Sequence, residues 1–229
     1  MVHFNWTQLI PGVGHDQVHV ATAIAVSAGL VLFAFAGRLA LGHGEAAIEP
    51  AKKFSIKGFF EVYLEAISGL TDMVVGEEGK KFVPMFAAVF MFIWINNLAG
   101  LLPGMTPATD NLNTTIALGL FSFFLYNFYG FKEHGLAYLK HFLGPLLALA
   151  PLMLVVELIS HIVRPLSLGL RLQGNMMGDH TVLGIFLVLV PYGVPVIFYL
   201  LGMFVSTMQA FVFTLLTMIY ISMAISHDH

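Results

Sequence analysis

Long apolar runs, separated by shorter polar connections, dominate the pattern of hydrophobic and polar positions along the chain. A helix that crosses a bilayer needs about 20 predominantly apolar residues. The first three runs of this kind lie at about residues 19–36, 82–102 and 114–131. Each of them predicts one membrane-spanning helix.

The connection between the first two runs, residues 42–81, is too charged to cross a membrane. Some of its apolar side chains recur at helical spacing, which gathers them on one side of a helix. These side chains are Phe59, Val62, Tyr63, Ala66 and Leu70. The pattern predicts an amphipathic helix that lies along the membrane surface.

The C-terminal part of the chain has much longer apolar runs, from about residue 142 to 190 and, after the break at 191–195, to about residue 226. As helices they measure ~70 Å and ~45 Å, against a hydrocarbon core of ~30 Å. We therefore predict a long, steeply inclined hairpin whose first helix bends near Pro165, where proline removes a backbone donor. The alternative is two short perpendicular spans with a turn near Pro165 or Gly174.

Basic residues fall on alternate connections. The N-terminal segment and the second connection carry none, whereas the first and third connections carry Arg38, Lys52, Lys53, Lys57, Lys80, Lys81, Lys132 and Lys140. By the positive-inside rule the basic connections are cytoplasmic. With five crossings, we expect the N-terminus outside and the C-terminus inside. An N-terminal segment without Lys or Arg does not resemble a secretory signal, so we expect no cleavage.

Composition agrees with a membrane protein, since 58% of the 229 residues are hydrophobic and 10% are charged. We expect one integral membrane domain over residues 1–229, with an external segment at 1–17, three spans in 18–131 and the hairpin, which carries the ion path, in 142–226. The absence of cysteine excludes disulfides and thiolate metal sites, and the net charge of -3 argues against nucleic-acid binding. We expect solvated histidines, and no metal, at His15, His19, His43, His134, His141 and His227.

One face of the long helix within residues 142–190 is polar over several turns. Its side chains, here called the polar stripe, are Glu157, His161, Arg164, Arg171, Asn175 and Asp179. At roughly 100° per residue they fall within an arc of about 80°. The last helix has a face of its own at the same spacing, formed by Gly202, Ser206, Gln209, Phe213, Thr217 and Tyr220. We predict that Gln209 faces the polar stripe across the hairpin.

Arg171 is the most demanding member of the polar stripe, because an arginine at mid-membrane costs at least ~3 kcal/mol. Glu157 lies too far along the helix to pair with it, and no carboxylate outside the stripe is predicted to lie inside the membrane. We infer that the acid that meets Arg171 belongs to a second subunit. Small residues around the stripe let another helix approach and slide, although we expect ordinary packing at Gly169; they are Ser160, Ser167, Gly169, Gly174 and Gly178.

Several segments, in one order, resemble subunit a of the F-type ATP synthase. They are RPLSLGLRLQGNM (164–176), MQAFVFTLLTMIYISMA (208–224), NNLAGLLPG (96–104), TPATDNLNTT and YLKHFLGP. By this resemblance Arg171 matches the family's essential arginine and Asn175 the asparagine one turn later. Gln209 matches the family's glutamine, and Glu157 the carboxylate upstream of the arginine.

The resemblance implies a stator with two offset half-channels that work against a rotating ring of small two-helix c subunits. Arg171 is then the charge separator, and the proton path is expected at Glu157, Asn175, His180, Gln209, Asp179 and His161, with Arg164 interpreted as an interface anchor. Because the chain shows no nucleotide-binding loop, ATP chemistry belongs to partners, and we expect no enzymatic activity and no cofactor here. The implied partners are the c-ring, the peripheral-stalk b subunits and, indirectly, the F1 ATPase sector, in a bacterial inner membrane.

The chain departs from the family pattern at two places. Many members have a glycine eight residues after the arginine and Glu or His at the ninth; here the eighth position is Asp179, with the glycine one residue earlier at Gly178, whereas His180 fits the ninth. Seven residues before the glutamine, where some members carry a partner for that Glu or His, this chain has Gly202. The role of Asp179 and the polar partner of His180 therefore stay open.

Three other classes of membrane protein were weighed against the polar stripe. A secondary ion transporter should show repeated halves, and no repeats are visible. An intramembrane hydrolase should show a motif such as HExxH or GxSxG, and both are absent. A purely structural anchor leaves the polar stripe unexplained.

Overall fold

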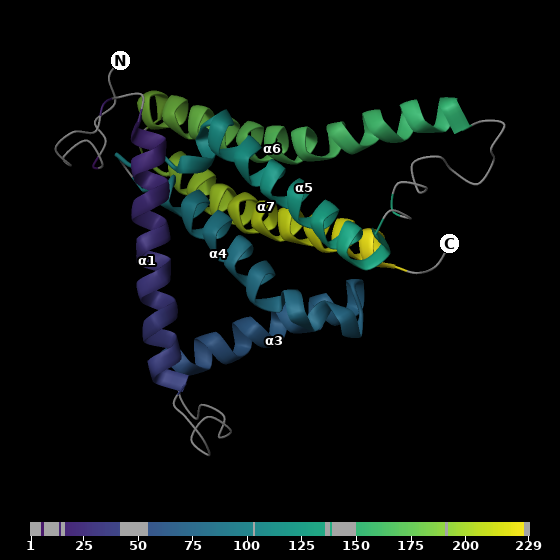
Figure 1. Cartoon of the computed structure of the whole chain (residues 1–229). Coiled ribbons are helices and arrows are strands. Elements are labelled where there is room, and N and C mark those ends of the chain that lie inside the picture. Colours follow the sequence, from purple (N-terminus) through teal and green to yellow (C-terminus); the bar gives the residue numbers. More distant parts are fainter. Residues whose placement is uncertain are drawn as a thin grey trace.

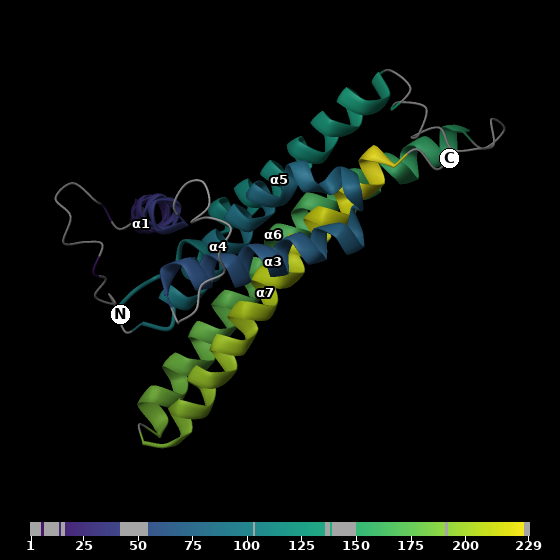
Figure 2. The same ribbon diagram turned by 90° about the horizontal axis from the view of Figure 1, so that it is seen from below.

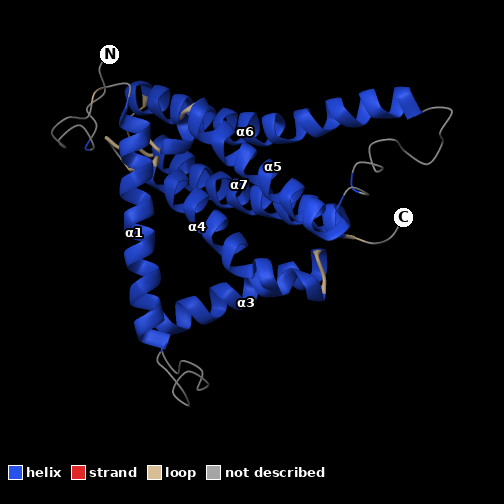
Figure 3. Cartoon of the chain, in the orientation of Figure 1, coloured by secondary structure: helices blue, strands red, loops and turns tan. Residues whose placement is uncertain are grey.

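Every element in the part of the chain that the structure describes is helical, as Figure 3 shows. The structure is a computed structural model, and it describes residues 6, 14, 17–41, 55–102, 104–135, 138, 150–190 and 192–226. No strand occurs within these residues. The prediction of an all-α chain is confirmed.

Five of the helices are long and apolar enough to cross a membrane. They are α1 (Val18–Leu41), α4 (Val83–Ala99) with the short helix η3 (Glu77–Phe82) before it, α5 (Leu112–His134), α6 (Ala150–Leu189) and α7 (Val194–Ile225). The predicted spans coincide with these helices to within a few residues, so the prediction of an integral membrane protein with five crossings is confirmed. The predicted start of the fourth run at residue 142 lies outside the described residues.

The last two helices form a long antiparallel hairpin (Figure 1). α6 passes through Pro165 without interruption and is 40 residues long, so the alternative with a turn near Pro165 or Gly174 is wrong. At about 1.5 Å per residue α6 measures ~60 Å, twice the ~30 Å hydrocarbon core. Figure 2 shows α1 nearly end-on while the hairpin runs across the view. The hairpin is therefore steeply inclined to α1, as predicted.

The turn of the hairpin depends on two special residues. Gly193 precedes α7 with a φ of 81°, a conformation that glycine adopts without steric strain. Pro195 stands in the first turn of α7, where a helix leaves the backbone N–H unpaired in any case. The chain can therefore reverse its direction within the few residues between Leu189 and Val194.

The predicted amphipathic helix is α3 (Ile56–Val74). The Ser55 side chain caps its start by accepting a hydrogen bond from the Gly58 N–H, 3.2 Å away. On its inner side Ile67 and Thr71 are buried, and the Tyr63 hydroxyl donates to the Ala87 carbonyl of α4 at 2.6 Å. Burial raises the pKa of Tyr63, so the hydroxyl keeps its proton and ties α3 to α4.

α5 packs closely against the middle of α6. A Cβ atom on Gly119 would collide with the Pro165 carbonyl oxygen, and one on Gly169 would lie 2.9 Å from the Thr115 carbonyl oxygen. The absence of side chains at the two glycines therefore lets the two backbones touch. The expectation of ordinary packing at Gly169 is confirmed.

α6 buries one face in the core. Leu168 and Leu172 are 2% and 0% exposed and pack in a cluster with Val89 and Ile93 of α4 and Phe213 of α7. With this face buried, the remaining faces of α6 are available for the polar stripe and for the surroundings of the chain.

Candidate functional site

The polar stripe runs along α6 from one end of the hairpin to the other. The end that holds the turn before Val194 is called here the turn end, and the end that holds Ala150 and Ile225 is called the open end. Asp179 lies nearer the turn end, Glu157 nearer the open end, and Arg171 between them. The three parts of the stripe have different surroundings.

Arg171, in the middle, points away from the core. Its side chain is exposed, and among the described residues it forms neither an ion pair nor a side-chain hydrogen bond. One and two turns later, a Cβ atom on Gly174 or Gly178 would meet no heavy atom within 4 Å. Arg171 therefore stands on an open surface of α6. The two glycines that follow it leave this surface free of side chains.

Asn175 joins the two helices of the hairpin next to Arg171. Its side-chain amide donates to Gln209 Oε1 at 2.6 Å, and Gln209 is only 5% exposed. The prediction that Gln209 faces the polar stripe across the hairpin is confirmed. A buried glutamine held in this way presents a fixed polar group beside the arginine.

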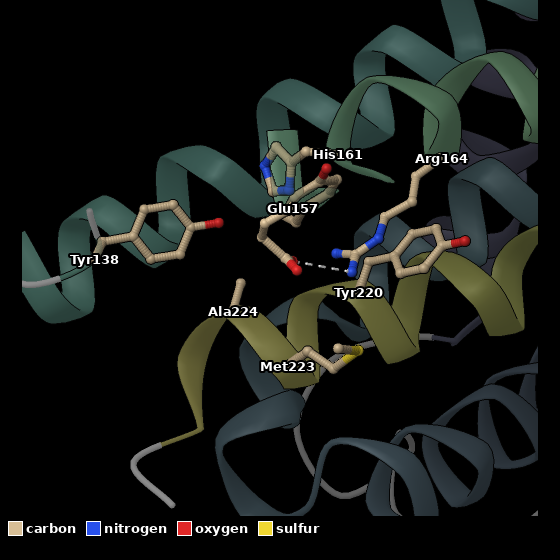
Figure 4. Close-up of a pocket in the computed structure, with 8 residues that line it drawn as sticks. Tyr138, Glu157, His161, Arg164, Tyr220, Met223 and Ala224 are labelled. Carbon is tan, nitrogen blue, oxygen red and sulfur yellow. Dashed lines mark ion pairs between the residues drawn. The ribbon is translucent and has the colours of Figure 1, made fainter. Parts of the chain in front are cut away.

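At the open end, Glu157 pairs with Arg164. Figure 4 shows the carboxylate directed at the guanidinium, with 3.6 Å between Glu157 Oε1 and the nearer guanidinium nitrogen. The Arg164 guanidinium also lies over the Tyr220 ring, 5.5 Å from its centroid, which adds a cation–π contact. Arg164, interpreted from the sequence as an interface anchor, is thus the partner of a predicted site residue.

A small cavity of about 40 Å³ lies between these side chains. It is lined by Tyr126, Tyr138, Glu157, His161, Arg164, Tyr220, Met223 and Ala224. A volume of this size has room for a few water molecules, and its phenol, carboxylate and guanidinium groups are suitable partners for them.

His161 is buried beside this cavity, with 7% of its surface exposed. Its Nε2 atom lies 2.9 Å from Asn127 Oδ1 of α5, and the Phe123 and Tyr126 rings meet it edge-on. The Tyr138 hydroxyl donates to the same Asn127 oxygen at 3.3 Å. Burial raises the pKa of Tyr138, although the charge of Arg164 opposes the shift, so the phenol keeps its proton. Asn127 therefore joins α5 to the polar stripe.

At the turn end, His180 meets Asp110. Asp110 ends the short helix η4 (Ala108–Asp110), and its Oδ2 atom is 3.8 Å from His180 Nδ1. Both residues line a groove of about 880 Å³ whose walls are otherwise mainly aliphatic. Gly202 offers His180 no polar side chain. Asp110, from a different part of the chain, places a carboxylate beside it instead.

Asp179 lies beside His180 but faces the hairpin partner α7. Its Oδ2 atom is buried and has no hydrogen-bond partner among the described residues. A Cβ atom on Gly202 would lie 4.0 Å from this oxygen. The Leu101 side chain occupies the place that a side chain at Gly202 would need, 2.8 Å from the position of such a Cβ atom, so α7 offers Asp179 no polar group at this position.

The structure divides the predicted site residues into three groups rather than one continuous line. Asn175 and Gln209 touch each other; Glu157 and His161 border the small cavity; Asp179 and His180 lie at the turn end. Three further polar residues that were not predicted complete these groups, namely Asn127, Tyr138 and Asp110. The described residues contain no cluster of three His, Cys, Asp or Glu side chains that would suit a metal ion.

Comparison with known proteins finds one matching family and several similar relatives. The sequence profile of the family "ATP synthase A chain" matches residues 20–222. The chain is 60% identical over 227 residues to ATP synthase subunit a of Bdellovibrio bacteriovorus, covering 99% of both chains. It is 46% identical to ATP synthase subunit a of Geobacter sulfurreducens, over 76% of both chains, and 43% identical to that of Sulfurihydrogenibium sp., over 75% of this chain and 83% of the relative.

Proposed function

The chain belongs to the ATP synthase A chain family, and from this membership we propose that it is the stator subunit a, which couples transmembrane proton flow to rotation and ATP synthesis. In this proposal the hairpin of α6 and α7 faces a ring of small two-helix c subunits. Two offset half-channels reach the ring from opposite sides of the membrane. One membrane domain carries the whole ion path.

The exposed position of Arg171 is the observation that carries the proposal. An unpaired guanidinium at mid-membrane is unstable unless a carboxylate or water meets it, and Arg171 has no ion-pair partner among the described residues. The open surface at Gly174 and Gly178 lets another helix approach. A rotor helix with a mid-membrane carboxylate satisfies both conditions.

The charge of Arg171 would make the rotor carboxylate release its proton on one side of the arginine and take one up on the other. A rotor carboxylate that faces lipid is favoured in its neutral form, because desolvation disfavours charge, whereas the same carboxylate facing Arg171 is favoured in its ionised form. A proton therefore leaves on one side of the arginine and another joins on the other side. Each charge that crosses releases ~2.3 kcal/mol per 100 mV. Because arginine keeps its proton under all these conditions, the separator itself carries no current.

The two ends of the polar stripe would supply the polar side chains of the two half-channels. Glu157 and His161 border the cavity at the open end, and His180 borders the groove at the turn end, next to Asp179. Asn175 and Gln209 are the polar pair beside Arg171. Protons would travel along water held by these groups, as far as the rotor carboxylate.

Topology and partners follow from the same proposal. The turn end and the N-terminus lie outside, and the open end and the C-terminus lie in the cytoplasm of a bacterium, with α3 along the inner membrane surface. The peripheral-stalk b subunits hold the chain in place, and nucleotide chemistry takes place on the F1 sector. The relatives are named as ATP synthase subunits, which supports a place in such a complex.

A single-cysteine cross-link tests the proposal. The chain contains no cysteine, so Gly178→Cys creates a unique thiol on the open surface beside Arg171, and Gly69→Cys creates a matched thiol on α3, also with free space around it. We expect a photoreactive maleimide at residue 178, but not at residue 69, to join the chain to a small two-helix subunit of the purified complex. A complex without such a ring would contradict the proposal and favour a secondary ion transporter.

A further inference from the structure

His180 lies at the turn end of the hairpin, on a stretch of α6 where the hairpin partner α7 offers only Gly202 opposite Asp179. The nearest carboxylate beyond its own helix is Asp110, from the connection between α4 and α5. The distance of 3.8 Å between His180 Nδ1 and Asp110 Oδ2 is that of an ion pair rather than of a direct hydrogen bond. A small rotation, or a water molecule in the groove that touches both groups, completes the contact.

The carboxylate of Asp110 is held in place by its own surroundings. Ala108 and Thr109 are fully buried, and the Thr109 hydroxyl donates to Asn97 Oδ1 of α4 at 2.7 Å. Asn97 in turn donates to the Ser206 carbonyl of α7 at 3.4 Å. The short helix η4 is thus bonded to α4, and the same asparagine of α4 is bonded to α7, so Asp110 meets His180 from a fixed position.

The imidazole is confined from its other side as well. A Cβ atom on Gly100, at the end of α4, would lie 2.5 Å from His180 Nε2, so only a glycine allows the ring to take this place. His180 Nε2 and Asp110 Oδ1 are both buried and have no hydrogen-bond partner among the described residues. Buried polar atoms of this kind are normally satisfied by water, and the adjoining groove of about 880 Å³ has room for it.

We propose that Asp110 is a positioning residue of the proton path: its carboxylate orients the imidazole of His180 at the boundary between the water of the groove and the interior of the hairpin. The inference rests on the proposed function, because it needs a proton path at the turn end. It differs from that function in assigning the partner of His180 to the connection between α4 and α5 rather than to the last helix.

The alternative for Asp110 is a purely structural contact that fixes η4 against α6. A structural contact would change how much complex assembles but not how fast each assembled complex moves protons. A positioning residue would change the proton flux of each complex. Its effect should also disappear once His180 is gone, because coupled residues give non-additive mutations.

The test is ATP-driven acidification of inverted vesicles that contain the whole ATP synthase, measured per assembled complex. We expect Asp110→Asn to lower this flux about tenfold or more, as loss of a group that positions a proton carrier does. Asp110→Glu should restore most of it, and Asp110→Asn combined with His180→Gln should be no worse than His180→Gln alone. The exposed Asp72→Asn on α3 is the matched control and should pump at the wild-type rate.

Two results would overturn the inference: wild-type flux per complex in Asp110→Asn, or losses that simply add in the double variant. If Asp110→Asn does not assemble, the exchanged pair Asp110→His with His180→Asp keeps one carboxylate and one imidazole face to face. We expect that pair to recover both assembly and flux, and failure of either would also contradict the inference. Arg171→Ala in the same vesicles distinguishes failure of this inference from failure of the proposed function. Coupled pumping by that variant would contradict the proposed function itself.

Discussion

The two ends of the polar stripe differ in their side chains and in the space beside them. At the open end, Glu157 and Arg164 form a pair of opposite charges next to a cavity of about 40 Å³ that is walled by tyrosines. At the turn end, His180 and Asp110 border a groove of about 880 Å³ with mainly aliphatic walls. One end is narrow and carries a pair of opposite charges, whereas the other is wide and has an imidazole beside a carboxylate.

Under the proposed function, this difference gives the two half-channels different surroundings. The cavity at the open end holds only a few waters, so under the proposed function it admits few charges at a time. The groove at the turn end has room for more water, so under the proposed function the side chains at its inner boundary select what passes. Arg171 lies between the two ends, on an open surface of α6.

α5 packs closely against α6 between the two ends of the polar stripe, and breaking this contact should have the largest effect. Gly119→Val places a branched side chain against the Pro165 backbone oxygen, which cannot move without displacing α6. We expect a destabilisation of about 3 kcal/mol or more, read as loss of the subunit from detergent-purified complexes. Gly69→Ala on α3, where a Cβ atom meets nothing within 4 Å, is the control. Normal assembly of Gly119→Val would show that the two backbones do not touch.

The ion pair at the open end should give the next largest effect. Arg164→Leu leaves Glu157 without its partner beside the small cavity. Because the two side chains are 24% and 40% exposed, we expect a loss of about 1–3 kcal/mol rather than the full penalty of a completely buried pair. The readout is the thermal stability of the purified complex. The exchanged pair Glu157→Arg with Arg164→Glu should regain part of the loss, and an exchanged pair that is less stable than Arg164→Leu would argue against a direct contact.

Thiol labelling compares the widths of the two ends directly. Leu183 lines the groove and Ala224 lines the small cavity, and the two residues are similarly buried, at 8% and 6% exposed. We expect a water-soluble maleimide to label Leu183→Cys severalfold faster than Ala224→Cys, because the thiolate that reacts forms only in contact with water. Equal rates in permeabilised vesicles would contradict the difference between a wide and a narrow end.

The aromatic contact of Arg164 should give the smallest effect. Tyr220→Phe keeps the ring under the guanidinium, whereas Tyr220→Leu removes it. We expect Tyr220→Leu to lower stability by about 0.5–1 kcal/mol more than Tyr220→Phe does, measured by thermal unfolding of the complex. If the two variants behave alike, the ring contact at 5.5 Å contributes nothing measurable.

Hydrophobic runs predicted the helices well because each span must satisfy its own backbone inside the membrane. Length alone then predicted the inclined hairpin, since α6 is about twice as long as the membrane is thick. The 3.6-residue period predicted which side chains share the stripe and that Gln209 meets it, a contact confirmed by the bond to Asn175. These features depend on local geometry and on the short turn that makes α6 and α7 neighbours.

The partners of His161 and His180 were beyond reach of the same reasoning. Asn127 is one polar residue in an apolar helix, and Asp110 lies in a connection that looked external to the membrane. Their contacts appear only once α5 is seen against α6 and η4 is seen packed against α6 and bonded to Asn97 of α4. Spacing along one helix contains no information about which neighbour packs beside it.

ATP-driven proton pumping by Arg171→Ala tests the central claim most directly. The measurement uses inverted vesicles in which the amount of assembled complex, including the rotor ring, is determined alongside acidification. We expect assembly to be retained, because Arg171 is exposed and forms no ion pair among the described residues, and we expect coupled pumping to be abolished. Coupled pumping that persists in the assembled variant would contradict the role of Arg171 as the separator of two half-channels.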